Sequence, residues 1–141
     1  MPKQTTYHQL RNLTHKKYKS IGKIHCPYFR KQVYFTSQGF WHLIYTGRNK
    51  SRDKRNQQLR FKLLKQAIKV IKTTTTLQEY QKIPWKNIYF YGFIAIVDGW
   101  KIKVIVKKRG KGKLTFWSVI PNWTTNKKRD RLLHKGNMET D

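Results

Sequence analysis

The clearest hydrophobic pattern lies in the C-terminal half, where β-branched and aromatic residues form three successive runs. Residues 88–97 are long and β-rich, and Asp98-Gly99 follows at once, a dipeptide typical of a tight hairpin. The return run alternates, with Trp100, Ile102, Val104 and Val106 on one face and Lys101, Lys103 and Lys107 on the other. A second basic turn precedes residues 114–120, and Pro121 ends that run. The pattern predicts a three-stranded antiparallel meander.

The N-terminal half has a different periodicity. Residues 32–36 have strand chemistry and end in a turn signal at residues 37–39, and residues 40–45 fit either a short strand or a helical turn. Between residues 57 and 72 the apolar positions follow steps of three and four, which places them on one face of a helix: Phe61, Leu64, Ile68 and Ile71. We therefore predict an α+β fold, in which N-terminal helical and strand elements and one amphipathic helix pack on a small antiparallel sheet.

The 141 residues suit one compact domain, and the ends differ in composition from the middle. Residues 1–24 and 124–141 are polar and basic, so we expect a basic N-terminal arm, a domain over residues 25–123 and a basic C-terminal tail. The N-terminus lacks the apolar segment of a secretory signal, and no run of about 18 apolar residues predicts a membrane span. Cys26 is the single cysteine, so no intrachain disulfide is possible, and we expect a cytoplasmic protein without a membrane partner.

Charge narrows the choice of partner. The chain has 32 Lys and Arg against 6 Asp and Glu, a net charge of +26, and a protein with this balance favours polyanions, with nucleic acid first. The carboxylates are scattered along the sequence, so no acidic cluster predicts a Mg²⁺ site, and His25-Cys26 lacks the partners of a zinc site. We expect RNA as the partner and no metal or other cofactor.

His42 is the one histidine within a patterned, foldable segment. An imidazole with an ordinary pKa of about 6.5 can act as general base or acid near neutral pH. Alternatively, His42 is a structural residue at the end of a strand. Basic residues that could hold phosphate groups follow it: Arg48, Arg52, Arg55, Arg60 and Lys62. Guanidinium groups bind two phosphate oxygens at once, although a solvated basic loop would look the same in sequence.

Three further residues are candidates on the predicted strands. Ser118 is a small hydroxyl residue among large ones, which could bind a phosphate or simply fill a tight place in the core. Tyr91 and Trp117 could position or stack a base, as aromatic side chains do with single-stranded RNA, or could pack in the core.

These residues also resemble a known family. Val33-Tyr34-Phe35-Thr36, the His42 segment, the helix from Arg60 to Ile71 and Trp117-Ser118-Val119-Ile120 together are similar to metal-independent ribonucleases of the barnase–EndoU–colicin–RelE fold, in its phage- and toxin-associated branch. The similarity spans about residues 32–123 and rests on a pattern of short elements.

The resemblance implies a central antiparallel sheet whose open face binds RNA. It also implies catalytic roles for His42 after the first strand, for Arg60 on the helix and for Ser118 in the last strand. Relatives often place a second histidine a few residues after the first, whereas this chain has Tyr45, Thr46, Gly47 and Arg48 there.

Together these observations predict a toxin-like endoribonuclease that acts on tRNA, mRNA or rRNA. In such an enzyme the 2′-OH attacks the adjacent phosphate and leaves a 2′,3′-cyclic phosphate. The positive charge also suggests an acidic protein inhibitor or antitoxin as a second partner. A non-catalytic RNA-binding protein of a ribosome or other ribonucleoprotein is the alternative, since basic arms suit that role. A DNA-binding regulator fits less well, because no helix-turn-helix or zinc-finger spacing is present.

Overall fold

The computed structural model describes residues 6–47, 50–121 and 137–141 and forms an α+β fold, as the sequence predicts. Its main sheet has six strands in the order β1-β2-β8-β7-β6-β5. All neighbouring strands are antiparallel except β2 and β8, which run parallel. The elements in chain order are α1 (Tyr7–Ile21), β1 (Lys23–Cys26), β2 (Lys31–Tyr34), α2 (Ser37–Ile44), β3 (Tyr45–Gly47), β4 (Lys50–Ser51), α3 (Lys54–Lys62), α4 (Leu64–Thr73), β5 (Glu79–Ile83), the short 3₁₀ helix η1 (Pro84–Lys86), β6 (Ile88–Val97), β7 (Trp100–Arg109) and β8 (Leu114–Ile120).

The predicted meander is present as β6, β7 and β8. Asp98 and Gly99 both have positive φ, at 52° and 80°, which matches the tight turn that this dipeptide favours. The pairing of β7 with β8 shifts register between Ile105 and Val106 of β7. Such an irregularity changes the direction of the side chains next to it on β8. This shift matters because it lies next to Ser118.

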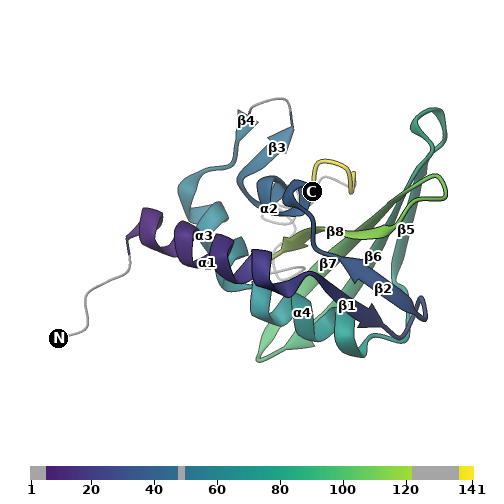
Figure 1. The fold of residues 1–141 in the computed structure, drawn as a ribbon, viewed down its shortest axis with the longest axis horizontal. Helices are drawn as coiled ribbons and strands as arrows, with labels where there is room; N and C mark the ends of the chain where they lie inside the picture. Colours follow the sequence, from purple (N-terminus) through teal and green to yellow (C-terminus); the bar gives the residue numbers. More distant parts are fainter. Residues whose placement is uncertain (1–5, 48–49, 122–136) are drawn as a thin grey trace.

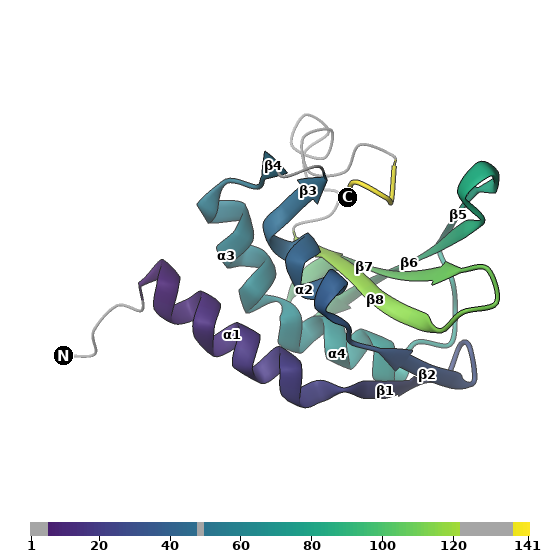
Figure 2. The same cartoon turned by 45° about the horizontal axis from the view of Figure 1, so that its top comes forward.

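The sheet has two different faces. Helix α4 lies against one face of the sheet (Figure 1), and α1 packs on α2 and α3. The main hydrophobic core fills the space between these helices and the sheet. Figure 2 shows residues 137–141 on the opposite side of the sheet from α4. There Met138 is buried in a smaller cluster with Ile83, Ile88 and Phe90. The second face is thus covered in part by the end of the chain rather than by a helix.

Both predicted basic ends contribute more to the fold than the sequence suggests. Residues 7–21, expected within a basic arm, form α1, which begins with a capping box between Thr6 and Gln9. Tyr18 on this helix is 2% exposed, and its hydroxyl donates to the backbone oxygen of Thr36 at 2.5 Å. In the predicted tail, Met138 and Asp141 are buried, and residues 124–136 lie outside the described residues.

The structure differs from the predicted single helix over residues 57–72, which is two helices, α3 and α4, that meet at Leu63 (ψ −2°). Residues 40–44 are helical, in α2, which is one of the two predicted alternatives. The charged stretch after them contains the small hairpin of β3 and β4. Strand β5 lies in a stretch for which the sequence pattern predicts no strand. No helix among the described residues is long and apolar enough to cross a membrane.

Candidate functional site

Helix α2 places His42 against the last strand of the sheet, and Gly39 makes this close approach possible. A Cβ at Gly39 would lie 2.4 Å from the backbone oxygen of Phe116, so only glycine fits without a shift. One turn later, His42 is 5% exposed and stacks on Trp117, with ring centroids 4.0 Å apart.

Arg52 contacts His42 twice. Its Nε donates to the backbone oxygen of His42 at 3.0 Å, and its Nη2 lies 3.2 Å from the His42 Nε2. Because a guanidinium can only donate hydrogen bonds, Nε2 must be the acceptor, and the ring proton must lie on Nδ1. The contact therefore requires a neutral imidazole.

Arg60 is 1% exposed, so its guanidinium is shielded from water. Its Nε donates to Asn56 Oδ1 at 2.7 Å, one turn earlier on α3, which fixes the plane of the guanidinium. Its Nη1 donates to Ser118 Oγ at 2.6 Å. Burial, followed by the charge of Arg52, lowers the pKa of Arg60, whereas Asp141 raises it. Helix α3 and strand β8 are thus joined by a buried cation and a hydroxyl.

Three of these groups meet at one oxygen. The backbone oxygen of Asp141 accepts from Arg52 Nη2 at 3.1 Å, from Arg60 Nη1 at 2.6 Å and from Ser118 Oγ at 3.2 Å. We call Arg52, Arg60 and Ser118 the anion pocket, because two guanidinium groups and a hydroxyl converge there on a single acceptor. The Nη2 of Arg52 joins this pocket directly to His42.

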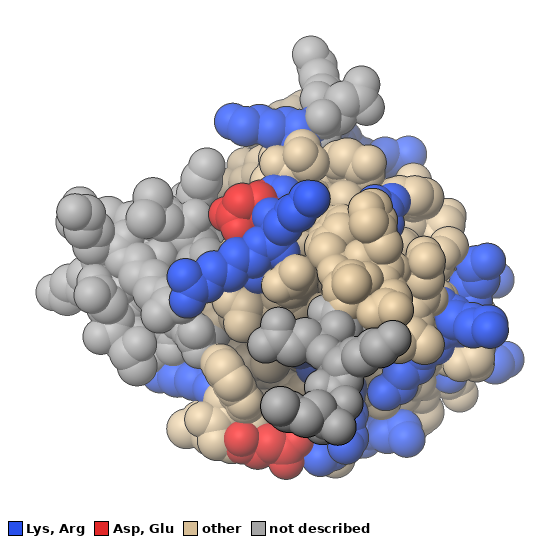
Figure 3. Space-filling view, turned by 90° about the vertical axis from the view of Figure 1, so that its left-hand side faces the viewer, with Lys and Arg blue, Asp and Glu red and all other residues tan. Residues whose placement is uncertain are grey.

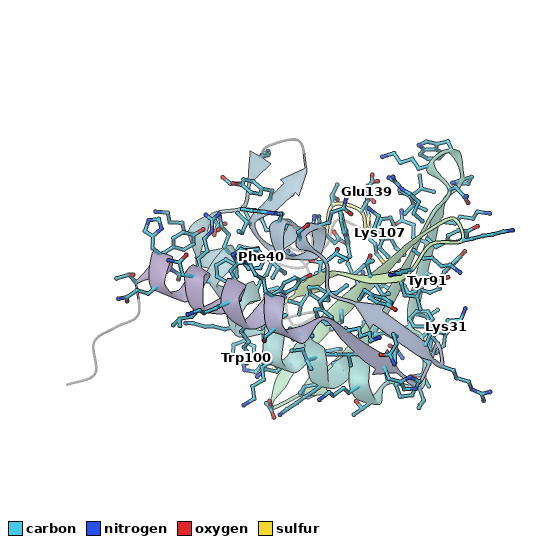
Figure 4. The ribbon with its side chains drawn as sticks, viewed as in Figure 1. Lys31, Phe40, Tyr91, Trp100, Lys107 and Glu139 are labelled. Carbon is cyan, nitrogen blue, oxygen red and sulfur yellow. The ribbon has the colours of Figure 1, made fainter. Side chains whose placement is uncertain are left out.

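Two lysines on β7 extend the positive charge along the same face of the sheet. Lys103 is 0% exposed, forms an ion pair with Glu79, and lies 3.8 Å from Asp141 Oδ2. The Nζ of Lys107 lies 4.2 Å from the centroid of Trp117. Figure 4 shows Lys107 near Glu139, beside residues 137–141. The site therefore has two further cations beside its two arginines.

The pKa of His42 differs from the ordinary value that the sequence suggests. Burial, then the charges of Arg52, Arg60 and Lys107, lower the pKa of His42 to about 2. The imidazole is consequently neutral at physiological pH, so it can accept a proton but cannot act as an imidazolium acid. A negative charge bound in the anion pocket would oppose the three cationic contributions and raise this pKa.

The structure brings together most of the residues singled out from the sequence, namely His42, Arg52, Arg60, Trp117 and Ser118.

Other candidates lie elsewhere. Arg55 and Lys62 are exposed on α3, outside the anion pocket, so the prediction that they share its phosphate contacts is not supported by their positions. Tyr91 lies on the opposite face of the sheet from Ser118, because it is paired with Val106. It lines a separate groove with Tyr34 and several lysines. Arg48 lies outside the described residues.

Sequence reasoning missed Asn56, Lys103 and Lys107 as parts of the site. Lys103 looked like a solvent-facing lysine in an alternating strand, and nothing in that pattern indicates that residues 137–141 cover it. Asn56 had a usable signal, since it precedes Arg60 by four residues and such pairs share one helix face.

The acidic side chains of the described residues serve structural contacts. Asp53 caps α3, and Asp98 and Glu139 pair with Lys69 and Lys86. Among residues 6–47, 50–121 and 137–141, no three His, Cys, Asp or Glu side chains form a group that could hold a metal ion. Figure 3 shows Lys and Arg spread around one face of the molecule, with Asp and Glu confined to small areas.

Comparison with known proteins adds no relative to this picture: no protein family, no curated protein and no solved structure matches the chain. The geometry of the site and the chemistry of its residues therefore carry the functional argument.

Proposed function

We propose that the protein is a metal-independent endoribonuclease whose active site is the anion pocket together with His42. The observation that carries this proposal is the convergence of Arg52, Arg60 and Ser118 on one oxygen, with the His42 Nε2 in contact with the same Arg52 nitrogen that reaches that oxygen. A phosphodiester oxygen offers the same kind of acceptor, and its negative charge suits two guanidinium groups. The resemblance to the barnase–EndoU–colicin–RelE group supports the same reaction.

In this proposal the scissile phosphate takes the place of the Asp141 oxygen. The guanidinium groups of Arg52 and Arg60 hold its non-bridging oxygens and stabilise the additional negative charge of the transition state. The hydroxyl of Ser118, already in contact with Arg60, orients the phosphate from the sheet. The neighbouring 2′-oxygen then attacks phosphorus, and the bond to the 5′-oxygen breaks.

His42 takes the proton of the 2′-OH in this scheme. Its Nε2 is an acceptor in the free protein, occupied by Arg52. When Arg52 turns toward a bound phosphate, Nε2 becomes available, and the phosphate charge raises the pKa of His42 so that it becomes a stronger base. The resulting imidazolium can return its proton to the 5′-oxygen, which gives a 2′,3′-cyclic phosphate and a 5′-OH with no net change in His42.

The test is RNA cleavage in the presence of EDTA, with the product ends mapped. Wild-type protein should cut RNA in many turnovers and leave cyclic-phosphate ends, and His42→Ala should lose this activity. His25→Ala is the matched control, because His25 is exposed on β1, away from the pocket. RNA that stays intact with wild-type protein, or equal cleavage by His42→Ala, would refute the proposal.

A non-catalytic RNA-binding protein is the second candidate, and one observation favours it. A groove of about 400 Å³, separate from the His42 site, is lined by four lysines and two tyrosines: Lys31, Lys108, Lys111, Lys113, Tyr34 and Tyr91. Lysines interleaved with aromatic rings suit RNA binding without chemistry. Tight binding of RNA without cleavage in the EDTA assay would select this function.

The same charge supports two further parts of the proposal. A ribonuclease with a net charge of +26 would act on the RNA of the cell that makes it, so we place it in the cytoplasm under control of an acidic inhibitor or antitoxin. Its substrate would be tRNA, mRNA or rRNA. Co-purification with an acidic protein that suppresses cleavage would test this partner.

A further inference from the structure

A groove of about 260 Å³ opens beside His42, and Arg60 is not among the residues that line it. Its lining is largely aromatic and comes from α2, β7 and β8: Gln38, Trp41, His42, Tyr45, Lys107 and Trp117. This volume is below the roughly 300–1,000 Å³ of pockets for drug-sized ligands, and suits one small planar group rather than a folded chain.

Trp41 gives the groove an accessible aromatic surface. It is 43% exposed although it is a large hydrophobic residue, and Tyr45 lies one turn further on, with the two ring centroids 6.0 Å apart. By contrast, Trp117 is already stacked on His42 and lies beneath Lys107. A planar ligand would therefore stack on Trp41 and meet the edge of Trp117.

The charges around the groove favour an anionic ligand that carries such a planar group. Arg11 lies over Trp41, with its Cζ 5.5 Å from the ring centroid, and Lys107 lines the groove. No Asp or Glu is among the described residues that line the groove. Gln38 is exposed at its rim, and its amide can both donate to and accept from the edge of a base.

We propose that this groove binds one unpaired nucleobase of single-stranded RNA, next to the phosphate held in the anion pocket. Because His42 lines the groove and also contacts Arg52 of the anion pocket, a nucleotide could place its base on Trp41 and its phosphate on Arg52 and Arg60 at once. This inference rests on the proposed function for its substrate class. It makes Trp41 a substrate-positioning residue and Gln38 a residue that selects the base.

Binding rather than cleavage provides the test. The probe is a fluorescent 2′-O-methyl RNA hexamer, which has no free 2′-OH and so cannot be cut, titrated by anisotropy at fixed salt. Trp41→Ala should weaken binding by roughly 5- to 150-fold, the range that one base–aromatic stack contributes. Trp85→Ala is the matched control, because Trp85 is 82% exposed on η1 and does not line the groove.

A second set of probes separates base stacking from a general effect of the substitution. The set consists of hexamers that each carry one abasic site, at a different position in each. One of them should bind wild-type protein as weakly as Trp41→Ala binds the intact hexamer. For that hexamer, Trp41→Ala should cause no further loss. Trp41→Leu, which keeps an apolar side chain of similar role in packing, should behave as Trp41→Ala does if stacking is the cause.

Two results would overturn the inference. The first is an equal affinity of Trp41→Ala and Trp85→Ala for the intact hexamer. The second is that, for every position of the abasic site, Trp41→Ala causes the same further loss of affinity as it does for the intact hexamer. The outcome is distinguishable from that of the proposed function. Coupling between Trp41 and one base without RNA cleavage would keep the base site and refute the nuclease. Cleavage in EDTA without such coupling would support the nuclease and refute the base site.

Discussion

Lowering the pH from 7.5 to 4.5 is expected to destabilise the wild-type protein by about 3 kcal/mol more than a His42→Gln variant. The pKa of His42 is lowered to about 2 in the folded protein, by burial first and then by Arg52, Arg60 and Lys107. In the unfolded chain the same imidazole has its ordinary pKa of about 6.5. Below that pH the unfolded state binds a proton that the folded state does not, so stability falls as the pH falls.

The magnitude follows from the distance between the pH and the unfolded pKa. At pH 4.5 the unfolded imidazole is protonated by a margin of about two pH units, and each unit corresponds to about 1.36 kcal/mol. The loss begins near pH 6.5 and continues toward the folded pKa of about 2. Glutamine does not titrate, and its side-chain oxygen can accept the hydrogen bond from Arg52, so the variant lacks this contribution.

Urea denaturation at the two pH values, followed by tryptophan fluorescence at constant ionic strength, measures the difference. All other titrating groups are common to the two proteins, so they cancel in the comparison. Parallel curves of stability against pH for wild type and His42→Gln would refute the reasoning. A value near 6.5 for His42 in an NMR titration of the folded protein would do so independently.

Three further outcomes are expected. Gly39→Ala should destabilise the fold by about 1–3 kcal/mol in thermal denaturation, because the new Cβ would lie 2.4 Å from the Phe116 backbone oxygen; an unchanged melting temperature would contradict this. Met138→Ser should tighten binding of an RNA hexamer up to about tenfold, because it loosens the segment whose Asp141 oxygen occupies the anion pocket; unchanged or weaker binding would argue against competition. Inorganic phosphate should raise the pKa of His42 in an NMR titration, since it opposes the cations that lower it, and no change at saturating phosphate would exclude binding next to the imidazole.

The strands of residues 88–120 are predictable because local signals there agree with the tertiary structure. Residues 88–120 combine β-rich runs with a turn dipeptide, and each strand is found where the pattern places it. Strands β1 and β5 escape prediction for a physical reason. They are short edge strands with several exposed residues, so they show neither a long apolar run nor the burial of a central strand.

The candidate site is predictable in its residues but not in its environment. His42, Arg60 and Ser118 can be selected from the sequence by their chemistry and their position relative to the elements. Their burial depends on contacts 58 and 81 residues apart in the chain, between Arg60 and Ser118 and between Arg60 and Asp141. The low pKa of His42 arises from this burial, and for that reason composition and spacing alone gave the ordinary value.

The arrangement of charge explains why a neutral histidine and a buried oxygen occur together in this site. Arg52 and Arg60 both donate to the Asp141 oxygen, so two like charges are held close together where water is largely excluded. Such a pair opposes folding unless an acceptor lies between the two groups, and a protonated His42 beside them would add a third positive charge. Asp141 supplies the acceptor in the free protein, and its charge favours the protonated form of both arginines. An RNA phosphodiester in place of residues 137–141 would keep the two guanidinium charges compensated, and its charge next to the imidazole would strengthen His42 as a base only when substrate is bound.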